Sequence, residues 1–245
     1  MHRFFSQNIN SDNITLCAED INHAVNVLRL KNGEEIVVCD GNYNDYICRI
    51  DDISKKSVHL TLLNHIVNEN EPRTNVILFQ GLPKSDKMEM IIQKCVELGI
   101  NSIIPVETAR SIAKIKDGGE KKQARWQSIA LAAAKQSHRG IVPKVGSVTG
   151  FEETIKQMSG FDLAIIPYEL ENSKSINAAL KKAGKKPKTI AIFIGPEGGF
   201  DDSEITFASS AGIVPVSLGK RILRTETAGF AALIMALFAL GEYDE

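Results

Sequence analysis

Hydrophobic and polar positions follow two different patterns along this chain, which divide it into two parts. In the first part, apolar and β-branched residues alternate with polar ones in short runs, a pattern typical of half-buried strands. The predicted strands are residues 35–39, 45–50 and 57–63. A helix is predicted between Asp20, which can cap its start, and Gly33, which ends it. Residues 1–70 are therefore expected to form a small β-rich domain.

From residue 74 to residue 245, apolar runs alternate with stretches of helical periodicity. Apolar strands that alternate with helices indicate a parallel sheet covered on both faces. The predicted strands are residues 76–80, 102–106, 163–167, 189–194 and 213–218. The predicted helices are residues 86–98, 120–137, 175–183, 202–211 and 226–240. The polar segment 64–74 lacks periodicity and is the expected linker.

The formal net charge of −1 is unevenly distributed along the chain. Residues 1–72 carry 6 Lys and Arg against 11 Asp and Glu, whereas residues 73–245 carry 23 against 19. If the partner is a polyanion, electrostatics places it on the second part. A modest basic face is also common as plain solvated surface, so charge alone does not identify the partner.

Four scattered cysteines, Cys17, Cys39, Cys48 and Cys95, form no CxxC pair and have no nearby set of histidines. They indicate free thiols in a reducing compartment, and we expect no disulfide framework and no metal site. The N-terminus lacks the basic-then-apolar run of a secretory signal, and no apolar stretch approaches the ~20 residues that span a bilayer. We therefore expect a soluble, cytoplasmic protein with no membrane partner.

Two loops at the carboxyl ends of predicted strands carry the candidate chemistry, since ligands of such sheets bind at that edge. The first, residues 194–200, reads IGPEGGF. Its glycines let the backbone adopt positive φ and approach a ligand closely, while Pro196 stiffens the turn. It matches neither a P-loop nor GxGxxG, so phosphate binding is not implied. The alternative is a tight turn into a helix, for which Asp201 and Glu204 predict a capping box.

The second loop, residues 218–228, reads LGKRILRTETA and joins the last predicted strand to the last helix. It carries three cations, Lys220, Arg221 and Arg224, just before a helix whose N-cap is predicted to be Thr225. The helix dipole disfavours positive charge at this end. Cations placed against this preference, with no evident benefit to stability, suggest a functional role. Their arrangement suits an anionic ligand, or negative charge that develops during a reaction. The alternative is an ordinary solvated loop.

In this order, IGPEGGF and LGKRILRTETA resemble the paired signature of the SPOUT methyltransferase superfamily. More narrowly, they resemble the 16S ribosomal RNA uridine N3-methyltransferases, which form 3-methyluridine. The likeness covers nearly the whole chain. Residues 1–6 and 23–33 resemble the family's PUA-like β-barrel, and residues 84–99 and 125–143 resemble its first helices and the loop after them. One departure is Ile141, at a position where the family usually has a second basic residue.

The resemblance implies an α/β fold in which a C-terminal parallel-sheet SPOUT domain (74–245), with a deep trefoil knot, follows a PUA-like, RNA-binding β-barrel (1–70). It also implies S-adenosylmethionine as the cofactor, bent within the knot loops, with S-adenosylhomocysteine as the product. The active site would form between the two subunits of a homodimer. Residues 228–240 contain no charged residue. That helix is therefore expected to be buried on most sides, either against a second subunit or in the monomer core.

Methylation at N3 of a uridine requires loss of the ring proton, so the site needs a base or cations that stabilise the anion. By position, Arg224 is expected to take this role, with Arg139 as the alternative. Glu197 and Glu226 lie nearby in the sequence, but each also has a local structural explanation, and no general base is identified. The residues expected to bind the cofactor are Leu170, Ile194, Gly195, Pro196, Glu197, Gly198, Leu218, Gly219, Ile222, Leu223 and Thr225. Those expected to contact 16S ribosomal RNA or the small ribosomal subunit are Arg3, Arg29, Lys84, Gln136 and Arg139.

Three other functions fit parts of the sequence. An α/β enzyme acting on a small molecule would use the same crevice, but it gives the β-rich N-terminal part no role. A non-catalytic ribosome-assembly protein would bind RNA and never S-adenosylmethionine. A methyltransferase of the same superfamily could act on another RNA or on a ribose 2′-hydroxyl. The likeness outside the two loops weakens this last alternative.

Overall fold

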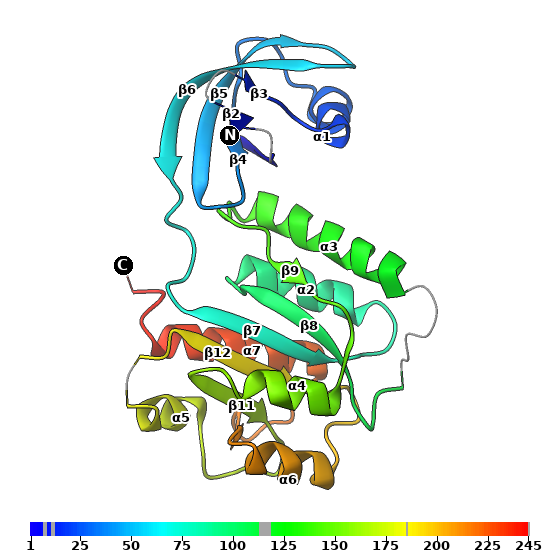
Figure 1. Ribbon diagram of the computed structural model, residues 1–245, viewed down its shortest axis with the longest axis vertical. Coiled ribbons are helices and arrows are strands. Elements are labelled where there is room, and N and C mark those ends of the chain that lie inside the picture. The colour runs from blue at the N-terminus through cyan, green and yellow to red at the C-terminus, as the bar shows by residue number, and fades with distance from the viewer. Residues whose placement is uncertain (7–8, 11–12, 113–118, 185, 245) are drawn as a thin grey trace. The chain divides into compact units, whose positions relative to one another are not determined.

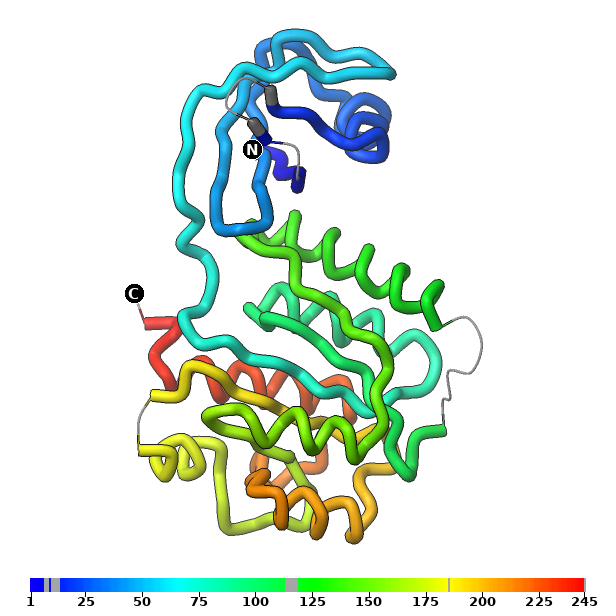
Figure 2. The backbone as a smooth tube through the Cα atoms, viewed as in Figure 1, coloured from blue at the N-terminus to red at the C-terminus, as the bar shows by residue number. Residues whose placement is uncertain are grey.

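The computed structural model describes residues 1–6, 9–10, 13–112, 119–184 and 186–244 (Figures 1 and 2). The chain forms two compact units. The first is Met1–Glu71 together with Ala134–Val142, and the second is Pro72–Ala133 together with Pro143–Glu245. Residues 134–142 were expected in the second domain, whereas in the structure they group with the first unit.

The first unit is built on a four-stranded sheet in the order β1-β4-β5-β6. β1 pairs with β4 in parallel, and β4, β5 and β6 follow one another antiparallel. A two-stranded hairpin and a short helical stretch complete the unit. In chain order its elements are β1 (His2–Phe5), β2 (Ile9–Asn10), β3 (Asn13–Ile14), α1 (Ala18–Asn22), the π-helical turn η1 (His23–Val27), β4 (Glu35–Cys39), β5 (Asn44–Ile53) and β6 (Val58–Val67).

One face of this sheet carries the core of the first unit, which includes the fully buried Phe4, Ile36 and Ile50. The strands predicted at 35–39 and 45–50 are confirmed. The third predicted strand corresponds to β6, which continues to Val67. The expected linker therefore does not begin at residue 64. The last residues of β6 belong to an edge strand that is exposed on both faces, so they show no alternation that the sequence could reveal.

The second unit contains an all-parallel sheet in the order β10-β8-β7-β12-β11-β13, with β9 also paired to β8. All five predicted strands are present. The central ones are largely apolar because helices cover both faces. The strands are β7 (Asn75–Gly81), β8 (Ser102–Glu107), β9 (Lys144–Val145), β10 (Thr149–Gly150), β11 (Leu163–Pro167), β12 (Thr189–Ile194) and β13 (Val214–Val216).

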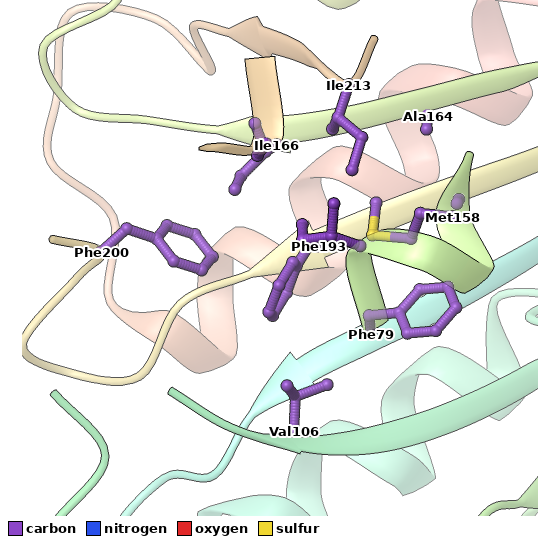
Figure 3. Close-up of a cluster of buried hydrophobic side chains, with 11 residues drawn as sticks. Phe79, Val106, Met158, Ala164, Ile166, Phe193, Phe200 and Ile213 are labelled. Atoms are coloured by element: carbon purple, nitrogen blue, oxygen red, sulfur yellow. The ribbon is translucent and has the colours of Figure 1, made fainter. Parts of the chain in front are cut away.

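Helices lie on both faces of this sheet (Figure 1). α7 packs against α2, α5 and strands β7 and β12. On the opposite face, residues of α4 and α6 surround Phe79 and Phe193, forming the cluster drawn in Figure 3. The five predicted helices are present, and α4 was not predicted. The helices are α2 (Lys87–Glu97), α3 (Gly119–Gln136), α4 (Phe151–Met158), α5 (Ile176–Lys182), α6 (Asp202–Ser210) and α7 (Thr225–Ala239). The trefoil knot implied by the resemblance stays a prediction.

A buried polar network holds residues 134–142 in the first unit. The Arg139 guanidinium binds the Glu71 carboxylate, and both side chains are less than a tenth exposed. Nearby, both terminal nitrogens of Arg3 donate to Asp45 at 2.6 Å, and Arg3 also donates to the Arg139 carbonyl at 3.1 Å. Asn68 donates to Asp45 at 2.9 Å. Each buried charge therefore has a partner of opposite sign.

Removing one member of this network should destabilise the first unit strongly. Glu71→Ala leaves the Arg139 guanidinium in the interior without its carboxylate, which typically costs about 3–5 kcal/mol. Arg49→Ala, which removes the exposed Arg49–Asp51 pair, should cost less than about 1 kcal/mol. Urea denaturation followed by circular dichroism measures both. Equal losses in the free energy of unfolding would show that the buried pair stabilises the protein no more than the exposed pair does.

Candidate functional site

The loops after β11, β12 and β13 meet at the carboxyl edge of the parallel sheet. Together they line a cleft of about 420 Å³, which continues into a smaller hollow of about 130 Å³. Pro167, Glu169, Ile222 and Leu223 line both cavities. The larger volume lies within the range of about 300–1,000 Å³ that is usual for small-molecule sites. The two loops singled out in the sequence therefore share one cleft.

Close backbone packing shapes the loop after β12. Gly199 has φ of 66°, and a side chain there would also meet the Glu169 carboxylate at 3.0 Å. At the end of β7, a Cβ on Gly81 would lie 2.6 Å from Pro196. Phe200 ends the loop and is nearly fully buried, with its ring edge-on to Phe193 at 4.8 Å between centroids (Figure 3). Glycine is required where the loop passes its neighbours, and Phe200 fixes the loop on the core.

A chain of hydrogen bonds joins this loop to the one after β13. The Thr225 hydroxyl donates to the Gly195 carbonyl at 2.6 Å and accepts from Gln80 Nε2 at 2.9 Å. Gln80 is fully buried at the end of β7 and also donates to the Gly81 carbonyl. The expectation that Thr225 caps α7 is therefore wrong. Arg224 occupies the N-cap position without a side-chain cap, and the Thr225 hydroxyl instead binds the neighbouring loop.

Lys87 lies between two carboxylates at the cleft. Its Nζ is 2.9 Å from Glu197 and 3.5 Å from Glu226. Burial of the Glu197 carboxylate alone would raise its pKa, but hydrogen bonds from Lys87 and from the Lys84 backbone N–H hold it below the usual value. The bond to Glu197 in turn raises the pKa of Lys87. Glu197 is therefore a weak proton acceptor that connects the loop after β7 to the loop after β12.

Three cations of the loop after β13 line the cleft and are not paired with carboxylates among the described residues. Arg224 lines the larger cavity, while Lys220 and Arg221 line the smaller one. All three are exposed, and none forms an ion pair within the described part of the chain. A positively charged rim of this kind can receive an anionic ligand or stabilise negative charge that develops during a reaction.

A second layer of contacts supports the loop after β12. Arg110 donates to the Gly198 carbonyl and to Asp201, each at 3.2 Å. Asp201 and Glu204 form the predicted capping box at the start of α6. The Tyr168 hydroxyl donates to Asp202 at 2.8 Å, and this bond raises the pKa of Tyr168 to about 12. Tyr168 therefore stays protonated and acts as a donor at neutral pH.

Ten of the eleven residues expected to bind the cofactor line the two cavities. They are Ile194, Gly195, Pro196, Glu197, Gly198, Leu218, Gly219, Ile222, Leu223 and Thr225. Leu170 is the exception, because its side chain is 68% exposed and lines neither cavity. Its neighbours Tyr168, Glu169 and Asn172 face the smaller cavity instead.

The residues expected to contact RNA fall into two groups. Arg29, Lys84 and Gln136 are exposed. Arg3 and Arg139 are buried and hold the polar network of the first unit together, so both have a structural role there. Arg139, the alternative to Arg224, lines neither of the two cavities.

Two polar residues of the cleft region, Gln80 and Lys87, were not singled out from the sequence. Gln80 gave a usable signal, since it is the one polar residue in the apolar run VILFQG at the end of a predicted strand. Lys87 gave none, because its position at the cleft depends on which strands are neighbours in the sheet.

Two kinds of feature are absent from the described residues. None of them form a group of three or more His, Cys, Asp or Glu side chains able to hold a metal ion. Within the same residues, no helix has both the length and the apolar character needed to cross a bilayer.

Two protein-family models match the chain. The model of an RNA methyltransferase domain matches residues 69–237, and that of an RNA methyltransferase PUA domain matches residues 16–63. These matches, together with the parallel sheet, confirm the expected α/β fold with a PUA-like N-terminal unit.

Similar proteins are found among both curated sequences and solved structures. Ribosomal RNA small subunit methyltransferase E of Bacillus subtilis is 37% identical, over 89% of this chain and 87% of the relative. The protein of the same name from Mesomycoplasma hyopneumoniae is 34% identical, over 95% and 97%.

Among structures, ribosomal RNA small subunit methyltransferase E of Neisseria gonorrhoeae bound to S-adenosylmethionine superposes with a TM-score of 0.87. It is 33% identical, over 97% of each chain. A Legionella pneumophila methyltransferase in complex with the same cofactor gives a TM-score of 0.88 at 29% identity, again over 97% of each chain. The chain therefore belongs to the RNA methyltransferase family whose members include ribosomal RNA small subunit methyltransferase E.

Proposed function

We propose that this protein transfers a methyl group from S-adenosylmethionine to N3 of a specific uridine in 16S ribosomal RNA. One observation carries the proposal: the glycine-bearing loop after β12 and the arginine-bearing loop after β13 form a single cleft. Relatives named ribosomal RNA small subunit methyltransferase E support ribosomal RNA as the substrate. The uridine and its N3 atom rest on the resemblance described above.

The cleft fits an adenosine-containing cofactor. Its larger cavity has apolar walls that suit a flat base, formed by Pro167, Ile194, Phe200, Leu223 and Ala228. Gly195, Gly198 and Gly199 line the same cavity, so no side chain at these positions separates the loop backbone from a ligand. When bound, S-adenosylmethionine supplies an already activated methyl group. The protein then mainly has to align the reactants and exclude water, and alignment can contribute roughly 7–11 kcal/mol.

Arg224 is the proposed catalytic residue. N3 of uracil becomes a good nucleophile only when its proton leaves, and the resulting anion spreads onto the neighbouring carbonyl oxygens. The Arg224 side chain lines the larger cavity, is exposed and has no ion-pair partner among the described residues. Its charge is therefore available to the uracil anion, and such preorganised charges stabilise transition states strongly. Arg139 stays the alternative for this role.

Lys87 and Glu197 are proposed to position the cleft without taking part in proton transfer. The Lys87 ammonium neutralises Glu197 and lies 3.5 Å from Glu226, so neither carboxylate faces the reactants as an isolated charge. The low pKa of Glu197 keeps it ionised and paired at neutral pH. For RNA binding we propose the exposed Arg29, Lys84 and Gln136, while contacts by Arg3 and Arg139 stay predictions.

We also propose that the protein acts as a homodimer through α7. One side of this helix packs against α2, α5 and the sheet, but Ile234, Met235 and Phe238 are 40%, 42% and 65% exposed. An apolar helix face of this kind is typical of a subunit interface.

The catalytic role of Arg224 can be tested in a strain that lacks the gene. We expect its small-subunit ribosomal RNA to lack 3-methyluridine, as measured by mass spectrometry, and the wild-type gene to restore it. Arg224→Ala should not restore it. In purified form this variant should lose about 10²–10³-fold in turnover while still binding S-adenosylhomocysteine, because only charge stabilisation is removed. Lys181→Ala, at the exposed end of α5, is the control. Full turnover by Arg224→Ala would exclude the residue from the mechanism.

The glycine-bearing loop can be tested by filling it. In Gly198→Val, the first side-chain carbon would lie 3.1 Å from Arg110 Cβ, and its branches would push the loop away from Arg110. We expect calorimetry to show at least a tenfold weaker affinity for S-adenosylhomocysteine. Gly150→Val is the matched control, since nothing lies within 4 Å of a Cβ there. Undiminished binding by Gly198→Val would mean that the loop is only a turn.

The dimer can be tested by charging the exposed face of α7. Phe238→Glu combined with Met235→Glu should give a monomer in sedimentation equilibrium, since a carboxylate cannot be buried without a partner. Lys182→Glu, on the exposed side of α5, should leave the assembly unchanged. A wild-type protein that sediments as a single chain would contradict the proposal directly.

A further inference from the structure

Two exposed ring side chains of the first unit lie on backbone that L-amino acids rarely adopt. Tyr43, in the turn between β4 and β5, has φ of 67°, and His138, in the segment after α3, has φ of 57°. Tyr43 is 43% exposed, and His138 is exposed as well. Glycine would occupy both positions without strain. Backbone strain of this kind concentrates at functional sites, so the rings themselves require an explanation.

The two positions are connected through a small set of hydrogen bonds. The Tyr43 N–H donates to the Gly140 carbonyl at 3.2 Å, so the turn and the segment after α3 lie side by side (Figure 2). Asn68 is buried and joins both: its N–H donates to the Tyr43 carbonyl at 2.6 Å, and its side chain donates to the His138 carbonyl at 3.2 Å. Asn70 donates to the same carbonyl at 2.9 Å. These hydrogen bonds therefore fix the backbone that carries both rings before any ligand binds.

Charge around this site is neutralised from within. Asp45 and Glu71, the carboxylates beneath it, are paired with Arg3 and Arg139. Because these carboxylates are paired, they repel an RNA phosphate less. The same pairs leave two of the unit's cations unavailable to bind phosphates. Lys135 and Arg49 are paired as well, with Asp20 and Asp51. Half of this unit's eight Lys and Arg side chains are thus paired, which weakens its binding to RNA through phosphates. Contacts to the bases themselves do not depend on those cations.

We propose that Tyr43 and His138 form a binding site for unpaired RNA nucleotides, whose bases stack on the two rings. The proposal rests on the function proposed above and names a part of the protein that recognises the RNA. Aromatic rings and imidazoles are the side chains on which splayed-out bases stack, and every base offers a flat face to them. The site therefore selects single-stranded RNA over duplex, whatever the sequence.

The test replaces both residues by glycine in the full-length protein. Tyr43→Gly with His138→Gly removes the rings and relieves the strain, so the melting temperature should stay the same or rise. The probe is a labelled single-stranded oligouridylate, with a blunt RNA duplex for comparison, in fluorescence anisotropy. We expect the Kd for the single strand to rise roughly 5- to 150-fold for each ring lost. The slope of log Kd against log salt should not change, because no phosphate contact is removed.

Two controls separate the rings from other effects. Tyr43→Phe with His138→Phe keeps both flat side chains and should bind nearly as tightly as the wild type. Ser85→Gly relieves the same left-handed strain (φ 58°) in the second unit and should not change the affinity. Unchanged binding by the double-glycine variant would overturn the proposal. An equal loss in the double-phenylalanine variant, or no wild-type binding to the single strand, would overturn it as well.

Methyl transfer distinguishes this proposal from the one on which it rests. In the double-glycine variant, KM for small-subunit RNA should rise while kcat at saturating RNA stays the same, since the rings lie outside the cleft residues. If the wild type methylates RNA and the variant keeps its KM, the ring site alone is wrong. If the wild type binds the oligouridylate through the rings but never transfers a methyl group, the catalytic proposal fails and the ring site stands.

Discussion

The Thr225 hydroxyl is the point on which the geometry of the cleft depends. It accepts from the buried amide of Gln80 and donates to the carbonyl of Gly195, so the ends of β7 and β12 and the start of α7 are joined at one side chain. A hydrogen bond of this kind is worth about 1 kcal/mol net, but a buried group left without its partner costs about 1–3 kcal/mol. The loops after β12 and β13 therefore cannot separate without exposing or orphaning polar groups. Arg224 directly precedes Thr225, and its backbone position follows from that of the hydroxyl.

Much of the second unit could be predicted because its signals are local. Apolar runs and helical periodicity identified its five longer strands, and in a parallel sheet the carboxyl ends of strands lie on one edge. That rule alone placed the loops at 194–200 and 218–228 near each other. The partners of Thr225 and Lys87 could not be predicted, since they depend on β7 lying beside β12 in the sheet. Strand order is a tertiary property that no local pattern carries.

Less of the first unit could be predicted from the sequence. Strand β6 continues through residues 64–67. These residues are exposed on both faces, so they lack the alternation that identifies a strand. The arginines of the first unit were assigned to RNA because arginine commonly binds phosphate. Burial changes that interpretation for Arg3 and Arg139, which neutralise carboxylates inside the unit. The acidic composition of residues 1–72 is partly a consequence: two of its carboxylates belong to the interior and do not contribute free charge to the surface.

The grouping of residues 134–142 with the first unit means that neither unit is a continuous piece of the sequence. α3 begins in one unit and ends in the other, so the polypeptide passes between them three times. Ending the gene after codon 71 would yield a fragment that keeps Glu71 and Asp45 but lacks Arg139 and the His138 carbonyl that accepts from Asn68. Homologous replacement of the N-terminal unit, as in chimaeras or natural domain shuffling, must therefore exchange two separate segments together. This requirement favours inheritance of the two units as a pair.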